Sequence, residues 1–305
     1  MSLYLRRLPK FEYLAPNSIK EACSMANRYK EDSKFLAGGT DLLVQMKNRQ
    51  EIPKLIIALK NILELDFIKY DKSSGLRIGA LTTLQSIVNS QMIKEKYNIL
   101  YEATNNMASL QIRNLGTIGG NICNGAPSAD TAPPLLVLNA KLKLVSMEGE
   151  QIVPIEEFFR GPFQTILSSN TILTEIIIDN PPPVSSSTYI KHTLRNAMDL
   201  ARVGVAVFIK LSSANNRKCE DARIALGACA PIPMRAKKAE EILRGHPLSD
   251  ENVQKASQAA SDESDPRVDS FRTPFEYRKE MIKVLTSKAI KETCTILAKD
   301  KGDKQ

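Results

Sequence analysis

Two glycine pairs are the segments of this sequence most able to bind a ligand. One lies in Ala37-Gly38-Gly39-Thr40-Asp41 and the other in Thr117-Ile118-Gly119-Gly120-Asn121, so each has a threonine and an acid or amide close by. Consecutive glycines let backbone N–H groups converge on one anionic group because no Cβ obstructs them, and nearby hydroxyl or amide side chains can complete the cradle. Two such loops would suit a diphosphate, whereas a single glycine pair is more often only a tight turn.

The common catalytic signatures are missing from the sequence. It holds no GxGxxG, GxxxxGK[ST], GxSxG or HExxH motif, so it does not predict a Rossmann site, a P-loop, a serine hydrolase or a zinc protease. The five cysteines contain no CxxC pair, which favours reduced thiols over a disulfide framework or a thiolate metal site. His192 and His246 fit surface or packing positions better than a catalytic base.

Short elements must hold the two glycine segments in place. Ser18 is a plausible N-cap for a helix that ends near Lys30, and a strand at 34–36 then leads into the first glycine pair. A helical turn at 42–49 and a strand at 54–58 follow. Before the second glycine pair we expect a hairpin within 62–81 and helical structure over 83–107.

A proline run predicts the boundary between two domains. Asn180 is followed by three prolines, which can neither continue a helix nor donate to a ladder, and then by Ser185-Ser186-Ser187. We therefore expect domains over 1–180 and 181–305. The second should be α+β, because apolar strand patterns precede helical ones. Its expected strands are 188–194, 203–211 and 223–228, and its expected helices are 235–244, 250–260 and 274–298.

Composition is that of an ordinary soluble protein. The 305 residues are 43% hydrophobic and 25% charged, which suggests about two domains. No apolar run reaches the ~18 residues of a membrane span and no secretory leader opens the chain, so we expect a cytoplasmic location. The net charge of +8 fits an anionic ligand, an acidic partner, nucleic acid or simply a lysine-rich surface.

Five ordered motifs resemble one known family. They are LAGGTDLLVQMK, TIGGNICNGAPSADTAPPLL, EEFFRGPFQTILSSNTILTEIII, YIKHTLRNAMDLARVGVAV and ARIALGACAPIPMRAKKAEEIL. In this order and at these separations they look like the FAD-binding medium subunit of the molybdenum hydroxylases, the xanthine dehydrogenase and carbon monoxide dehydrogenase family. The resemblance extends from about Phe11 to Arg278.

The resemblance implies a particular α+β architecture. Residues 1–180 would form a two-part FAD-binding domain of the vanillyl-alcohol-oxidase (PCMH) type, with subdomains of about 1–58 and 59–180. Residues 181–305 would form a small C-terminal domain with a three-stranded antiparallel sheet and helices, as in the carbon monoxide dehydrogenase flavoprotein.

The resemblance also implies which residues bind FAD. The first segment would contribute Leu36, Ala37, Gly38, Gly39, Thr40, Asp41, Leu42 and Leu43, with the glycines and Thr40 on the pyrophosphate. The second would contribute Thr117, Ile118, Gly119, Gly120, Asn121 and Ile122.

Four single residues complete the implied site. Asp130 would accept hydrogen bonds from FAD hydroxyls, and it also fits a helix N-cap. Met107 and Leu173 would pack near the cofactor, although Met107 equally fits a core position at a helix end. Lys191 would reach the flavin region and stabilise negative charge on the reduced cofactor, or else be an exposed strand lysine.

The implied role is electron transfer in a multi-subunit enzyme. A small subunit with two-iron iron–sulfur clusters would pass electrons from a large molybdenum–pterin subunit to FAD in this chain, and FAD would pass them to NAD or another acceptor. No catalytic acid or base and no metal ligand need reside here, and neither nucleic acid nor a membrane span is expected. The alternatives are a self-sufficient flavin oxidoreductase with the same FAD fold and a cofactor-free basic protein that binds nucleic acid.

Overall fold

The N-terminal part of the chain, residues 12–58, is a small parallel sheet with helices. The computed structural model describes residues 7–299 except 196, 214–217 and 269–272. The sheet has the order β1-β3-β2, and both strand pairs are parallel. Ser18 caps the first helix as expected, since its side chain accepts a hydrogen bond from the Glu21 backbone. The elements are β1 (Glu12–Leu14), α1 (Ile19–Tyr29), η2 (Lys30–Asp32), β2 (Ser33–Leu36), α2 (Leu42–Lys47) and β3 (Leu55–Ala58).

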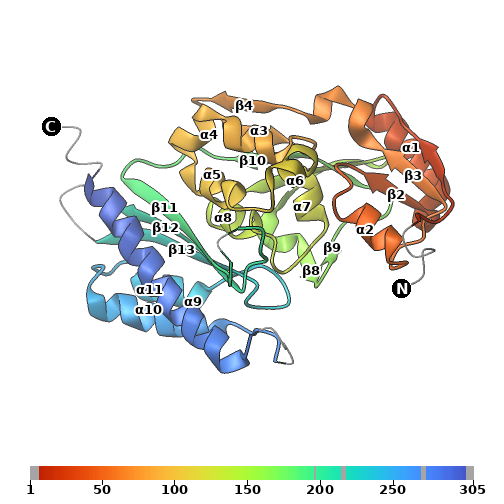
Figure 1. The fold of residues 1–305 in the computed structure, drawn as a ribbon. Coiled ribbons are helices and arrows are strands. Elements are labelled where there is room, and N and C mark those ends of the chain that lie inside the picture. Colours follow the sequence, from red (N-terminus) through yellow and green to blue (C-terminus); the bar gives the residue numbers. More distant parts are fainter. Residues whose placement is uncertain (1–6, 196, 214–217, 269–272, 300–305) are drawn as a thin grey trace.

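The central part, residues 59–178, is an antiparallel sheet covered by short helices (Figure 1). Its strand order is β4-β5-β10-β6-β7. The long strand β10 therefore lies in the middle of the sheet, although it is the last of these five strands in the sequence. Buried residues of α3, α4, α5, α7 and α8 and of β5, β6 and β10 belong to one core. The strands are β4 (Ile68–Asp71), β5 (Gly75–Gly79), β6 (Lys141–Ser146), β7 (Gly149–Pro154), β8 (Phe159–Gly161), β9 (Gln164–Thr165) and β10 (Ile172–Ile178). The helices are η3 (Leu59–Asn61), η4 (Leu63–Leu65), α3 (Leu84–Asn89), α4 (Gln91–Lys96), α5 (Asn98–Asn105), α6 (Leu110–Leu115), α7 (Ile118–Cys123), α8 (Ala132–Val137) and η5 (Ile155–Glu157).

The C-terminal part, residues 185–299, is an antiparallel sheet of order β11-β12-β13-β14, with three helices among its described residues. Its described strands number four rather than the expected three, because Met234 and Arg235 form a fourth strand paired with Leu226 and Ala225. Two residues are too few to show an alternating pattern in sequence. The elements are β11 (Ser185–His192), β12 (Val203–Leu211), β13 (Cys219–Gly227), β14 (Met234–Arg235), α9 (Lys237–Leu243), α10 (Asp250–Glu263) and α11 (Phe275–Lys299).

Strand β12 joins the C-terminal sheet to the central part. Val203, Val205, Val207 and Ile209 pack into a core with α9–α11, whereas Ala206 and Phe208 belong to the core of the central part. Successive side chains of a strand point to opposite faces, so both faces of β12 are buried. The nearly continuous apolar sequence of β12 follows from this position between two layers (Figure 1).

One expectation about secondary structure is wrong. The serines at 185–187, expected to be linker, form the start of β11 and pair with Lys210, Ile209 and Phe208 of β12. Backbone hydrogen bonds to the neighbouring strand outweigh the local sequence pattern there. The helical structure expected over 83–107 is present as three short helices, α3, α4 and α5, with Ser90 ending α3 and capping α4.

The described residues contain no helix long and apolar enough to cross a membrane. They also contain no group of three or more His, Cys, Asp or Glu side chains that could hold a metal ion. The described residues form no disulfide, and Cys23, Cys219 and Cys229 are buried, as expected for core thiols.

Candidate functional site

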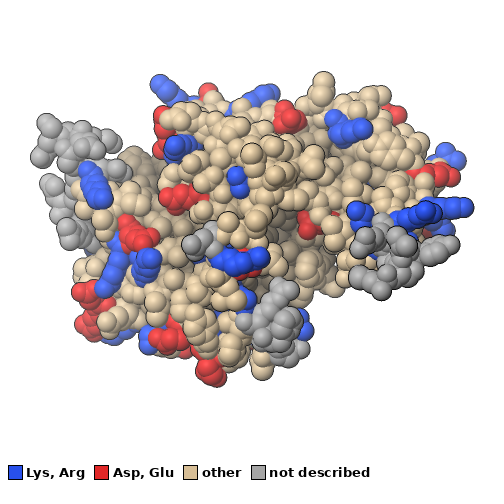
Figure 2. All heavy atoms as spheres, in the orientation of Figure 1, with Lys and Arg blue, Asp and Glu red and all other residues tan. Residues whose placement is uncertain are grey.

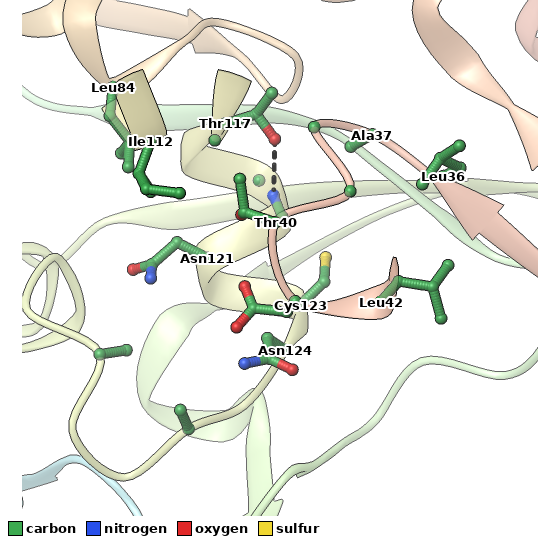
Figure 3. Close-up of a pocket in the computed structure, with 18 of the residues that line it drawn as sticks. Leu36, Ala37, Thr40, Leu42, Leu84, Ile112, Thr117, Asn121, Cys123 and Asn124 are labelled. Carbon is green, nitrogen blue, oxygen red and sulfur yellow. Dashed lines mark hydrogen bonds between the residues drawn. The ribbon is translucent and has the colours of Figure 1, made fainter. Parts of the chain in front are cut away.

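A cavity of about 710 Å³ lies where the N-terminal and central parts meet. Both glycine segments line it, and in Figure 3 the first loop, with Ala37 and Thr40, runs past the N-terminal end of α7, where Thr117 lies. A third contribution to the cavity comes from Met198, Asp199 and Leu200, in the segment between β11 and β12. Segments far apart in the sequence therefore share one site.

The first glycine segment is a loop with free backbone donors. The amides of residues 38–42 make no hydrogen bond to any described residue, while Leu43 and Gln45 already donate to the carbonyls of Gly39 and Asp41. Gly39 has a φ of +74°, a conformation that L-residues seldom adopt. This run of unpaired N–H groups beside the cavity is a ready anion-binding surface.

The second glycine segment is not a loop, and this expectation is wrong. Residues 118–123 form helix α7, capped by Thr117, whose hydroxyl accepts a hydrogen bond from the Gly120 amide at 3.0 Å. The amides of Ile118, Gly119 and Asn121 donate to backbone carbonyls of the central part, so they are already paired. The helix therefore contributes side chains and close backbone approach to the cavity rather than a set of free amides.

Gly119 is a packing position. Its amide donates to the Ala80 carbonyl at 3.0 Å, and a Cβ added at Gly119 would lie 2.6 Å from that same oxygen. We expect Gly119→Ala to lower the free energy of unfolding by about 1–3 kcal/mol, because the backbone must move to relieve the overlap. Urea denaturation measures the effect, with Gly161→Ala as the comparison, since the nearest atoms to a Cβ at Gly161 belong to the flexible Gln164 side chain, the first at 3.1 Å. Equal stability of Gly119→Ala and the parent would contradict the packing role.

Most of the residues expected to bind the ligand do line the cavity. They are Leu36, Ala37, Gly38, Gly39, Thr40, Asp41, Leu42, Met107, Thr117, Gly119, Gly120, Asn121, Asp130 and Leu173. The other four expected residues, Leu43, Ile118, Ile122 and Lys191, are not among the residues that line it. Ile118 and Ile122 are fully buried in the core, because α7 turns them away from the cavity.

Lys191 forms a buried ion pair with Asp130. The Lys191 ammonium lies 2.8 Å from the Asp130 carboxylate, and each side chain is only 7% exposed. Lys191 also donates to the Asn106 carbonyl at 3.1 Å, and the Tyr189 hydroxyl donates to Asp130 at 2.8 Å. Burial raises the pKa of Asp130, and the charge of Lys191 opposes that rise. Lys191 is therefore not an exposed strand lysine.

The cavity is poor in unpaired positive charge. Among the described residues that line it, Lys34 is the cationic side chain, and it pairs with Glu51 at 3.2 Å. Partial burial raises the pKa of Asp41, the carboxylic acid beside the first glycine pair. An anionic ligand must therefore be held by neutral donors, and the free amides of the first loop are the available set.

Several cavity residues could not be recognised from the sequence. Cys123 lies one helical turn after Gly119 on α7, and Phe163 follows the short strand β8. Burial raises the pKa of the Cys123 thiol to about 12, so this thiol stays protonated at neutral pH. For Cys123 the helical period would have been a usable signal had 118–123 been recognised as a helix. For Phe163 no local signal exists.

Comparison with protein families identifies the kind of domain that forms this cavity. Residues 9–181 match the model of the FAD binding domain in molybdopterin dehydrogenase. Residues 188–293 match the model of the CO dehydrogenase flavoprotein C-terminal domain. Apart from Met198, Asp199 and Leu200, the residues that line the cavity thus belong to an FAD-binding domain.

Individual relatives give the same result over most of the chain. The putative xanthine dehydrogenase FAD-binding subunit of Escherichia coli K12 is 34% identical over 261 residues, 85% of this chain and 88% of the relative. The glyceraldehyde dehydrogenase medium chain of Sulfolobus acidocaldarius is 34% identical over 284 residues, 93% of this chain and 98% of the relative. A carbon monoxide dehydrogenase structure from Hydrogenophaga pseudoflava superposes with a TM-score of 0.90 at 32% identity, covering 95% of this chain and 99% of that one. The chain belongs to the FAD-binding medium subunits of the xanthine dehydrogenase and carbon monoxide dehydrogenase family.

Proposed function

We propose that this chain is the electron-transfer subunit of a multi-subunit molybdenum hydroxylase and that it holds one FAD in the cavity described above. The single observation that carries the proposal is the run of unpaired amides at residues 38–42 on the wall of a 710 Å³ cavity. Neutral N–H donors bind a diphosphate without requiring lysine or arginine. A volume of this size is within the usual range for cofactor pockets.

Individual residues fit the parts of FAD. The amides from Gly38 to Leu42 would bind the diphosphate, and the Asn121 side chain, whose carbonyl oxygen accepts from Thr131 at 2.6 Å, keeps its NH₂ group for the ligand. Asp130 would accept hydrogen bonds from cofactor hydroxyls. Leu173 and Met107, both buried, would exclude water from the ring system.

The chemistry of the subunit comes from the cofactor, and the chain supplies position and surroundings. Bound FAD provides a group that accepts and releases electrons singly or in pairs. Leu173 and Met107 would border this group with apolar side chains. We propose no catalytic acid or base and no metal ligand in this chain.

We propose two partner subunits and a soluble acceptor. By analogy with the enzymes in which the relatives are medium chains, a small subunit with two-iron clusters would deliver electrons from a large molybdenum–pterin subunit, and NAD is a candidate acceptor. We place the assembly in the cytoplasm, where disulfides are rare, since the described cysteines form no disulfide. Domains of 1–180 and 181–305 are part of the same proposal.

The chain should contain one FAD per molecule, bound without a covalent link. Cys123 is the cysteine among the described cavity residues, none of which is a histidine, and its protonated thiol is a poor nucleophile. Acid precipitation should therefore release all the yellow colour into the supernatant. Colour that stays in the pellet would point to a tether at Cys123, and Cys123→Ser would then release it.

A reconstitution experiment tests the electron-transfer role. The FAD-loaded chain alone should show no turnover of purines, aldehydes or N-heterocycles, whereas co-expression with the two proposed partner subunits should yield a stable complex. Turnover by the isolated chain would favour a self-sufficient oxidoreductase.

The surface charge gives little support to the nucleic-acid alternative. On the face drawn in Figure 2 the described lysines and arginines are interspersed with acidic residues and do not form one basic patch. A colourless protein that shifts DNA would support that alternative.

A further inference from the structure

A tyrosine of the C-terminal sheet holds the cavity carboxylate. The Tyr189 hydroxyl donates to one oxygen of Asp130 at 2.8 Å, while Lys191 donates to the other oxygen at 2.8 Å. Both donors lie on β11, two residues apart, so they point to the same face of the sheet. Asp130 lines the cavity and is 6% exposed. Both of its oxygens are thus fixed from outside the cavity, by another part of the chain.

The neighbouring strand makes room for the phenol. In the sheet Lys191 pairs with Gly204 of β12, and a Cβ added at Gly204 would lie 2.8 Å from the Tyr189 hydroxyl oxygen. Any larger residue at 204 would push the phenol out of line with Asp130. The absence of a side chain at this one position therefore allows the hydrogen bond.

The same sheet also holds the far end of the helix that follows Asp130. Arg223 of β13 donates to the Val137 carbonyl at 2.8 Å, and Arg235 of β14 donates to the Asn139 side chain at 3.0 Å. A cation at the last turn of a helix satisfies its free carbonyls and complements its dipole. Helix α8, Ala132–Val137, is thus tied to the C-terminal sheet at both ends.

We propose that Tyr189 is a positioning residue for the cofactor site: with Gly204 giving it room, it orients Asp130 and keeps that carboxylate ionised for hydrogen bonding to the ligand. The C-terminal sheet would then support the FAD site by holding Asp130 through Tyr189, although Tyr189 itself does not line the cavity. The inference rests on the proposed function for the identity of the ligand and on the structure alone for the contact.

The surroundings of Asp130 explain why two donors are needed. Burial favours its neutral form, and Lys191 and Tyr189 oppose this by donating to the charged form. Two other titratable groups lie near Tyr189. Burial raises the pKa of the Cys229 thiol to about 12, and burial also raises the pKa of Glu102. Neither supplies a positive charge. If the Tyr189 hydroxyl were removed, Lys191 would be the one described side chain still donating to the Asp130 carboxylate, so the pKa of Asp130 would rise.

The variant Tyr189→Phe tests the inference because it keeps the ring and removes only the hydroxyl. We expect its Kd for FAD, measured by fluorescence titration of the cofactor-free chain at pH 7, to be about tenfold higher than that of the parent. Since loss of a donor raises the pKa of Asp130, FAD binding should begin to weaken at a higher pH in the variant as the pH is lowered from 8.5 to 5.5. Tyr97→Phe is the matched control: Tyr97 is 1% exposed, and its hydroxyl lies near the Asp179 carbonyl instead. The control should keep the Kd and pH profile of the parent.

A second variant separates positioning from simple loss of packing. Gly204→Ala should weaken FAD binding in the parent, but it should have little further effect when combined with Tyr189→Phe, because the displaced hydroxyl is then absent. Additive effects of the two changes would overturn the inference, as would an unchanged Kd and pH profile in Tyr189→Phe.

A readout without FAD distinguishes failure of this inference from failure of the proposed function. Carboxyl ¹³C shifts of aspartate-labelled protein should show Asp130 titrating at higher pH in Tyr189→Phe than in the parent. An unchanged Asp130 titration would overturn the positioning role even if FAD binds. If the parent binds no FAD, the proposed function fails, while a shifted titration would still support the contact.

Discussion

Gly39→Val should lose FAD almost completely, with a Kd more than tenfold above that of the parent. Valine at a φ of +74° is strained, because the left-handed conformation costs about 1–2 kcal/mol for an ordinary residue and more for a β-branched one. Its Cβ would lie 3.1 Å from terminal methyl groups of Leu36 and Leu43. The loop must then change course, and the free amides of residues 38–42 no longer converge. Equilibrium dialysis against FAD and the flavin absorbance of the purified protein both measure the loss.

Gly245→Val is the control that isolates the effect on the ligand. Gly245 has a φ of +78°, nearly that of Gly39, but it follows α9 in the C-terminal part and a Cβ there would meet no atom within 4 Å. The backbone strain should therefore be similar in the two variants. Gly245→Val should lose stability yet keep FAD. If both variants bind FAD equally well, the first loop is not the diphosphate site.

Lys191→Met should lower the free energy of unfolding by about 3–5 kcal/mol at neutral pH. The substitution removes one partner of an ion pair whose two side chains are each 7% exposed, and it leaves the Asp130 carboxylate buried without its cation. Chemical denaturation of the cofactor-free chain measures the loss.

The loss of unfolding free energy in Lys191→Met should grow as the pH rises. The pKa of Asp130 is already raised in the folded chain, and removing Lys191 raises it further. Between the unfolded and folded pKa values the folded state binds one more proton than the unfolded state, so stability falls as the pH rises. The free energy of unfolding of the variant should thus be closest to that of the parent at acidic pH. The difference between them should be largest above the folded pKa of Asp130.

The double variant Lys191→Met, Asp130→Asn tests the origin of the deficit. It removes the unpaired charge, so it should recover most of the stability lost in Lys191→Met and should show no pH dependence from this site. A double variant as unstable as the single one would mean that Lys191 stabilises the fold through the Asn106 contact and its own packing rather than through Asp130.

The sequence by itself determined the family and much of the fold. The glycine pairs with their flanking threonines, in order with three later motifs, were sufficient to identify an FAD-binding medium subunit. Capping at Ser18 and the apolar run of β12 are local signals, so they predicted α1 and this strand without knowledge of the rest of the chain. The expected ligand residues of the first loop also line the cavity, except Leu43.

Only the tertiary structure decided how the second glycine segment and Lys191 are used. Residues 118–123 form a helix because the amides at its start find acceptors at Ala80 and Thr82, which no local pattern reveals. Lys191 pairs with Asp130, 61 residues away, because β11 packs beside the segment that precedes α8. Both outcomes depend on which distant groups are buried together. In a dry interior each polar group must find a partner, so packing rather than local sequence determined these roles.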